Sequence, residues 1–219
     1  MLYKEIKYLI AKDFALELKQ KYALNGILLY VLSTVFVSYL SFERIIDSRT
    51  WNALFWIIML FSAVNAVSKS FVQESQGRQL YYYTLVSPRA VILSKIVYNL
   101  LLMAVIALLC FGVFSMFMGS MIDNYPRFLA ALLLGGWGFS GILTMVAAIA
   151  SRSGNNFALM AILSFPIVLP LLLTLIRFSL SALVGGPLLA GPGYILVLLG
   201  LNLLVIALAT LLFPYLWHD

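Results

Sequence analysis

The sequence predicts an all-α integral membrane protein with six transmembrane helices, and three observations support this prediction. Of the 219 residues, 63% are apolar and only 10% are charged, with a mean hydropathy of +1.04. The charged residues are gathered in short blocks between long apolar runs. The apolar runs are continuous and lack the period-two alternation of a barrel strand. A water-soluble enzyme and a β-barrel are therefore both excluded as fold classes.

Six apolar stretches are long enough to cross about 30 Å of hydrocarbon as helices, which rise about 1.5 Å per residue. The expected transmembrane spans are residues 24–42, 51–68, 96–118, 128–150, 157–176 and 194–213. The segments between them are too short for a separate folded domain. Residues 1–219 are therefore predicted to form a single transmembrane domain.

Residues 1–22 precede the first span and are predicted to form an amphipathic interfacial helix in the plane of the lipid headgroups. Apolar residues recur there at helical spacing opposite three lysines, while Asp13 and Glu17 interrupt the apolar stripe. The alternative is a short cytoplasmic helix that packs on the protein. The apolar residues are Leu2, Ile6, Leu9, Ile10 and Phe14, and the lysines are Lys4, Lys12 and Lys19.

The distribution of cations predicts that both termini lie in the cytoplasm. With this orientation the inside segments carry most of the Lys and Arg residues, as the positive-inside rule requires. The net charge of +6 then serves orientation and contact with anionic headgroups, and no nucleic-acid partner is expected. The inside cations are Lys4, Lys7, Lys12, Lys19, Lys21, Lys69, Arg78, Arg89, Lys95 and Arg152, and the outside cations are Arg44, Arg49, Arg127 and Arg177.

The segment from Lys69 to Lys95, between the second and third spans, is the largest predicted inside segment and the one suited to present a surface to a partner protein. Its first part is predicted to form a short helix and turn, its three tyrosines are interface anchors, and Ser87-Pro88 precedes the third span. The alternative is an ordinary connecting loop with an aromatic belt. The helix-and-turn residues are Glu74, Gln76, Gly77, Arg78 and Gln79, and the tyrosines are Tyr81, Tyr82 and Tyr83.

Several chemical functions are disfavoured by residues that the sequence lacks. Apart from Lys69 at the end of the second span, no ionisable group lies in a predicted span, which argues against an ion-coupled carrier. The chain has no G-x-x-x-x-G-K-[ST] phosphate loop, so ATP would have to be hydrolysed by another subunit. The single cysteine, Cys110, and the single histidine, His218, cannot form a Cys/His metal cluster. The chain is therefore predicted to have no enzymatic activity of its own.

The fourth span carries a small residue at every fourth position, at Gly136, Ser140, Thr144 and Ala148. A stripe of this kind lets a neighbouring helix approach closely along one face. The stripe therefore predicts a helix-packing seam. The neighbouring helix is either another helix of the same chain or a helix of a second copy.

Prolines and glycines interrupt the last part of the chain. Pro166 and Pro170 remove backbone donors and are expected to bend the fifth span near its middle. Residues 177–193 stay apolar but contain several glycines and prolines, so they are too interrupted for another crossing. They are expected to form a re-entrant or interfacial hairpin near the outer surface.

Together, the amphipathic start, the six spans, the large second inside segment and the broken apolar segment before the last span resemble an ABC-2 type exporter permease. More specifically, the chain is similar over essentially its whole length to the CcmB family, the heme exporter protein B of cytochrome c maturation. Arg152-Ser153-Gly154, Pro166 and Pro170 add to the resemblance. Its sharpest part is the pattern Glu74, Gly77, Leu80, Leu85, Ser87-Pro88, Leu93 and Lys95.

The resemblance implies an ABC-2 type permease fold that works within a complex. Two permease copies would bind two copies of a separate ATPase, the heme exporter protein A, together with other membrane subunits that handle heme. ATP hydrolysis by the ATPase would drive delivery of heme or release of a periplasmic heme chaperone. The residues of the ATPase-coupling interface would be Glu74, Gln76, Gly77, Arg78, Leu80, Ser87 and Pro88.

No cofactor is expected to bind directly to this chain, and heme is expected to be held mainly by a partner subunit. Axial heme ligation commonly uses His, Cys, Met or Tyr, and the only histidine, His218, lies at the predicted cytoplasmic end. The four tryptophans are dispersed and do not form the W-G-x-x-W-x-W-D signature of other heme-handling membrane proteins. Two other functions stay open: an ABC-2 permease for a lipid, glycan or drug, and a membrane scaffold that transports nothing.

Overall fold

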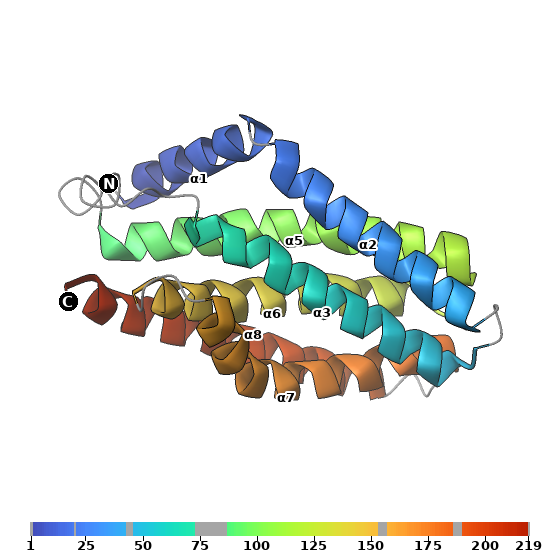
Figure 1. Ribbon diagram of the computed structural model, residues 1–219. Helices are drawn as coiled ribbons and strands as arrows, with labels where there is room; N and C mark the ends of the chain where they lie inside the picture. The colour runs from blue at the N-terminus through green and yellow to red at the C-terminus, as the bar shows by residue number, and fades with distance from the viewer. Residues whose placement is uncertain are drawn as a thin grey trace.

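The computed structural model describes residues 2–19, 21–42, 46–72, 87–152, 157–185 and 190–218. These residues are almost entirely helical and contain no strand, which confirms the predicted all-α fold class. Figure 1 shows the helices side by side along one long axis of the molecule. The helices are α1 (Leu2–Lys19), α2 (Lys21–Phe42), α3 (Ser48–Val72), α5 (Pro88–Met118), α6 (Tyr125–Arg152), α7 (Phe157–Leu183) and α8 (Ala190–His218).

Six of these helices are long and apolar enough to cross a membrane, as the sequence predicts. Their membrane windows are Asn25–Phe42, Ser48–Ser68, Pro88–Met118, Tyr125–Ser151, Ile162–Leu183 and Gly191–Pro214. The start of α1, the start of α5 and the end of α8 lie at the same end of the bundle (Figure 1).

The helices extend beyond the predicted spans and bring charged residues into the spanning elements. Hydropathy predicts that the third span begins after Lys95, but α5 begins at Pro88 and contains both Arg89 and Lys95. Arg127 and Arg177 likewise lie inside α6 and α7. The expectation of spans without ionisable groups therefore holds for the predicted ranges but is wrong for the helices themselves. Helical hydrogen bonding does not stop at a charge when the side chain finds a partner or reaches the membrane surface.

Helix α6 is the centre of the bundle. In its membrane window 78% of the residues are buried, against 17% in the window of α2, which lies at the periphery. Helix α6 packs on α3, α5, α7 and α8, whereas α2 packs mainly on α3 and α5 (Figure 1). The position of α6 thus determines how the other spans are arranged.

Glycines in α6 allow this central position because they remove the side chains that would separate the helices. A Cβ atom on Gly135 would lie 2.8 Å from the Trp56 ring. A Cβ atom on Gly138 would lie 2.6 Å from Leu171 Cδ2 and 2.8 Å from Asn202 Oδ1. A Cβ atom this close would force Trp56, Leu171 or Asn202 to shift, so glycine lets α3, α7 and α8 approach α6 closely at these positions.

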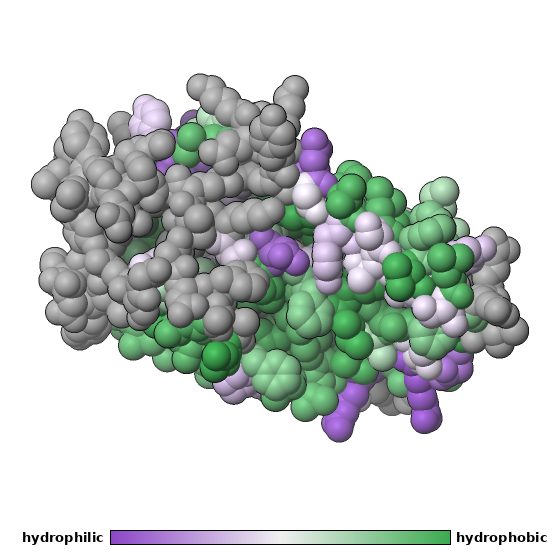
Figure 2. Space-filling view, in the orientation of Figure 1, coloured by the Kyte–Doolittle hydropathy of each residue, from purple (hydrophilic) through white to green (hydrophobic). Residues whose placement is uncertain are grey.

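Apolar side chains cover most of the outer surface of the spans. Figure 2 shows a predominantly apolar face with hydrophilic residues concentrated in a few places. Apolar residues exposed to this degree on every peripheral helix are typical of contact with lipid and not with water. Examples are Leu29, Val37 and Leu40 of α2, Ile162 and Phe165 of α7, and Leu196, Leu203 and Leu211 of α8.

The apolar segment 177–193 differs from the predicted hairpin. Helix α7 continues to Leu183, a turn follows in which Gly185 has φ +66°, and α8 begins at Ala190. The carbonyl of Ala182 accepts hydrogen bonds from the backbone amides of Asp123 (3.1 Å) and Asn124 (2.9 Å). The described part of the segment is therefore divided between two long helices, because burial of residues such as Ala182 favours continuation of α7.

We expect Gly138→Ala to destabilise the bundle, because the added methyl group meets Leu171 and Asn202 at less than 3 Å. Overpacking of this kind costs about 1–3 kcal/mol. The matched control is Gly200→Ala on α8, where an added Cβ has no neighbour within 4 Å. Thermal unfolding of the detergent-purified variants measures the difference, and equal melting temperatures for both would contradict the close packing of α6.

Candidate functional site

The start of α5 is fixed by a polar contact with α1. Ser87 is the N-cap residue, with extended backbone angles, and Pro88 at the first helical position has a φ angle already suited to a helix. The Ser87 carbonyl accepts hydrogen bonds from the amides of Ala90 (2.9 Å) and Val91 (3.2 Å). Glu5 Oε2 accepts hydrogen bonds from the Ser87 amide (3.3 Å) and hydroxyl (3.0 Å). The carboxylate thus compensates the partial positive charge of the helix N-terminus.

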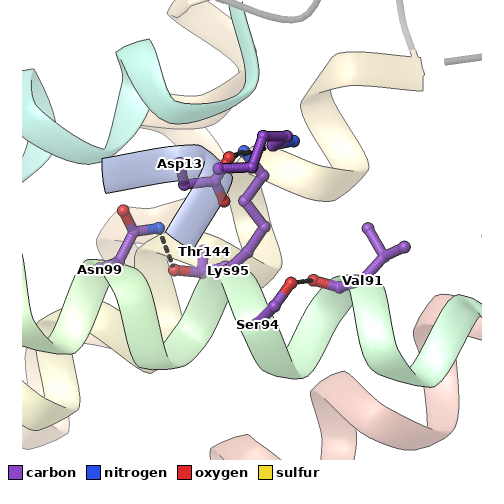
Figure 3. Close-up of polar contacts among 7 residues, drawn as sticks. Asp13, Val91, Ser94, Lys95, Asn99 and Thr144 are labelled. Carbon is purple, nitrogen blue, oxygen red and sulfur yellow. Dashed lines mark hydrogen bonds and ion pairs between the residues drawn. The ribbon is translucent and has the colours of Figure 1, made fainter. Parts of the chain in front are cut away.

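A buried ion pair joins the same two helices two turns further along. Lys95 Nζ of α5 lies 3.4 Å from Asp13 Oδ1 of α1, and both side chains are only 5% exposed (Figure 3). Lys12 Nζ lies 3.1 Å from the same oxygen, but its side chain is 26% exposed. Removing one partner of a buried pair leaves an uncompensated charge in a low-dielectric region, which is strongly unfavourable. The pair therefore ties α1 to α5.

An aromatic contact is a third interaction between α1 and α5. The rings of Phe14 and Tyr98 meet edge to face, with their centroids 5.3 Å apart and an interplanar angle of 79°. Leu9 is buried and Ile6 packs against the core. Helix α1 therefore packs on the protein through residues of its apolar stripe, while Tyr8 on its outer face is 75% exposed. Its position in the plane of the lipid headgroups stays a prediction. Asp13, which interrupts the stripe in sequence, lies on the packed face because it meets Lys95.

The small-residue stripe of α6 faces α5 within the same chain. Ser140 Oγ donates to the carbonyl of Ile96 (3.0 Å), and Asn99 Nδ2 donates to Thr144 Oγ1 (2.8 Å; Figure 3). A Cβ atom on Gly136 would lie 3.8 Å from the carbonyl oxygen of Met103. Ala148, the fourth member of the stripe, is also buried. For the first three members the structure thus places the neighbouring helix inside the monomer.

The opposite end of the bundle contains a second polar network, which joins α3 to α7. Trp56 Nε1 donates to Ser179 Oγ (2.7 Å), and Ser179 Oγ donates to Asn52 Oδ1 (2.7 Å). Asn52 Nδ2 donates to the carbonyl of Ile176 (2.8 Å), and Trp51 Nε1 donates to the carbonyl of Gly119 (3.0 Å). Asn52, Trp56 and Ser179 thus hold α3 and α7 in register, and Trp51 ties α3 to Gly119 directly after α5.

Asp47 directly precedes α3 at this opposite end and is exposed to solvent. Its carbonyl accepts from the Trp51 amide (2.9 Å), and its carboxylate accepts from the Thr50 hydroxyl and the Arg49 amide. The hydrogen bond from Thr50, assisted by that from Arg49, lowers the pKa of the Asp47 carboxyl. Asp47 is therefore an ordinary helix cap in its ionised form.

The predicted ATPase-coupling residues divide between described and undescribed parts of the chain. Ser87 and Pro88 form the start of α5, as described above. The other members of the interface lie outside the described residues, so their role stays a prediction. They are Glu74, Gln76, Gly77, Arg78 and Leu80.

The buried contact between Lys95 and Asp13 is the part of this site that hydropathy and motif spacing do not predict. Lys95 belongs to the pattern that resembles the permease family, but its position next to a span suggests an exposed lysine. The signal was the carboxylate of Asp13 on an otherwise apolar helix face. Helical periodicity places Asp13 on that face, but it cannot identify the helix that packs there.

An apolar cavity of about 290 Å³ lies between α5 and α6. Its walls contain no charged residue and none of the usual axial ligands of heme. Among the described residues no group of three His, Cys, Asp or Glu side chains could hold a metal ion. The residues that line the cavity are Leu100, Ala104, Leu132, Leu133, Leu134, Gly136 and Trp137.

These features define a multi-pass α-helical membrane protein whose third span is tied through polar contacts to a helix outside the spans. The model of the CcmB protein family matches residues 4–215, which is nearly the whole chain. The chain therefore belongs to the CcmB family, the permease component of an ABC-2 type heme exporter for cytochrome c maturation. Comparison with curated proteins and with solved structures gives no significant match.

We expect Thr144→Val to destabilise the α5–α6 seam, because the isosteric change leaves the buried Asn99 amide without its acceptor. An unsatisfied buried donor costs about 1–3 kcal/mol. The matched control is Thr174→Val on α7, where the hydroxyl bonds to the Pro170 carbonyl of its own helix near the surface. Thermal unfolding in detergent is the measurement, and a control as unstable as Thr144→Val would refute a specific role for the seam.

Proposed function

We propose that this chain is the permease subunit that couples ATP hydrolysis by a separate ATPase, of the heme exporter protein A type, to delivery of heme or release of a periplasmic heme chaperone. The observation that carries this proposal is the CcmB family match over residues 4–215. In its working form the permease is paired with a second copy of itself and with the other membrane subunits of cytochrome c maturation. It lies in the bacterial inner membrane with both termini in the cytoplasm.

The division of labour follows from the chemistry of the chain. ATP hydrolysis needs backbone amides and a lysine that surround the phosphates, and the sequence contains no loop of the P-loop type. ATP therefore binds to the partner, and the permease has no catalytic residue. In this proposal heme is handled by the complex and held mainly by other subunits, because the single histidine of the sequence, His218, lies at the predicted cytoplasmic end.

In this proposal the ATPase acts on the permease through the polar segment that ends at Ser87-Pro88. Glu74, Gln76, Gly77, Arg78 and Leu80 contact the ATPase in this proposal. The segment leads directly into α5, whose first turn is held by Glu5. A displacement of the segment therefore reaches a spanning helix without an intervening flexible linker after Ser87.

The topology is tested with single cysteines introduced by Ser75→Cys and Asp123→Cys in a Cys110→Ala background. With both termini inside, an impermeant thiol reagent added to intact cells should label the Asp123→Cys variant and not the Ser75→Cys variant, as the positive-inside rule requires. Permeabilised cells provide the control that both sites are reactive. Labelling of Ser75→Cys in intact cells would show the reverse orientation.

The coupling interface is tested by Glu74→Lys, which reverses a charge on the proposed ATPase-contacting surface. A reversed contact in a desolvated interface costs about 2–5 kcal/mol, so ATPase co-purification should fall by roughly thirtyfold or more. Gly77→Val should act similarly if Gly77 occupies a turn, because a β-branched residue is strained at positive φ.

The matched control for the charge reversal is Asp123→Lys, an exposed position between the end of α5 and the start of α6. Total permease in the membrane, ATPase co-purification and holocytochrome c formation are measured for each variant. Normal co-purification together with normal maturation in Glu74→Lys would make the segment a plain connector and would overturn the coupling assignment.

A further inference from the structure

Two carboxylates of α1 contact α5 with the same sequence offset. Glu5 meets Ser87 and Asp13 meets Lys95, and each pair is separated by 82 residues. Helices α1 and α5 therefore run parallel and in register over two turns, as their courses in Figure 1 also indicate. Two contacts at different heights fix both the position and the direction of α1, whereas a single contact would leave it free to pivot.

Burial makes the second contact the stronger restraint. Both side chains of the Asp13–Lys95 pair are 5% exposed, and Asp13 Oδ2 has no hydrogen-bond partner among the described residues. If α1 moved away from α5, it would take the Asp13 carboxylate away from a buried ammonium group of a spanning helix. Breaking a buried pair is far more costly than breaking an exposed one.

The same part of α5 is bonded to the central helix. The Ile96 carbonyl accepts from Ser140, and the Asn99 side chain donates to Thr144, so α5 is joined to α6 within one turn of Lys95. Figure 3 shows Asp13, Lys95, Asn99 and Thr144 close together along α5. Separate polar contacts on the same stretch of α5 therefore join it to α1 on one side and to α6 on the other.

We propose that α1 and the first three turns of α5 move as one rigid unit, with Asp13 and Lys95 as the positioning residues that hold it together. The unit carries a displacement of the segment that ends at Ser87 to α6. This role rests on the proposed coupling function. The rigidity itself is a property of the permease alone, and it can be tested without the ATPase.

The first test compares two lysines that contact the same oxygen of Asp13. Lys12→Met removes the closer partner on the same helix, which is 26% exposed, and Lys95→Met removes the buried partner on α5. The reporter is the yield of a short reducible thiol cross-link between Phe14→Cys and Tyr98→Cys, whose native rings are in contact. The native Cys110 is replaced by alanine in all variants.

We expect Lys95→Met to lower the cross-link yield at least threefold and cytochrome c maturation at least fivefold at equal permease abundance. Lys12→Met should stay within twofold of the parent in both measurements. Equal effects of the two substitutions, or none from Lys95→Met, would overturn the role of the buried pair. Should Lys95→Met fail to accumulate, the exchange Asp13→Lys/Lys95→Asp decides: recovery of cross-linking supports the pair, and no recovery refutes it.

The second test asks whether α1 and α5 move together. In the parent pair Phe14→Cys/Tyr98→Cys, cross-linking should leave maturation within twofold of the reduced protein, because the linked helices do not separate during the cycle. A loss of fivefold or more that is restored by reduction would show that α1 must leave α5. The single-cysteine variants, treated with the same reagent, control for modification without linkage.

The two proposals fail in different ways. A wrong coupling function appears as normal ATPase co-purification in Glu74→Lys, whatever the cross-link yield. A wrong rigid unit appears in the cross-link yields of Lys95→Met and Lys12→Met in membranes that lack the ATPase. If one of the two proposals fails its test, the test of the other proposal can therefore still be interpreted.

Discussion

The close approach of four helices to α6 is the constraint on which the rest of the structure depends. Within a bilayer the lipid tails are as apolar as the helix surfaces, so helix association depends on close packing and on polar contacts. Gly135 and Gly138 provide the close packing, because a side chain at either position would overlap a neighbour. Ser140 and Thr144 provide the polar contacts with α5. Larger residues at these positions would separate the spans and expose their polar groups to hydrocarbon.

Two groups of buried polar residues form contacts between helices, and each group sets the register of different helices. At one end Asn52, Trp56 and Ser179 join α3 to α7. At the other end contacts centred on Lys95 and Asn99 join α1, α5 and α6. Because buried polar groups need partners, a slip of one helix by a single turn would leave several of them unsatisfied. These contacts therefore restrict sliding of α5 and α7.

The architecture could be predicted from sequence because the bilayer imposes a length and a polarity on every span. The same reasoning misplaced the start of the third span, because hydropathy reads Lys95 as a boundary and cannot recognise that Asp13 compensates it. It also predicted a hairpin at 177–193, because glycine and proline interrupt the pattern locally while burial of Ala182 continues α7. The family could be recognised from the motif around Ser87-Pro88, whereas the contact with Glu5 depends on the packing of α1. Local sequence patterns thus predict the helices, whereas the residues that contact one another between helices can be identified only from the folded structure.

The proposed coupling between a cytoplasmic ATPase and the membrane bundle requires a mechanically stiff connection at the membrane surface. An amphipathic helix held only by lipid would shift along the headgroups and dissipate such a displacement. Helix α1 is instead held at its beginning by Glu5 and in its middle by Asp13, both against α5. The polar contacts of Asn99 and Ile96 then lead to the helix that the other spans surround. The residues best suited to transmit force are thus those that form buried polar contacts between helices. A permease with the proposed coupling role needs these contacts to be stiff, and it needs no catalytic group.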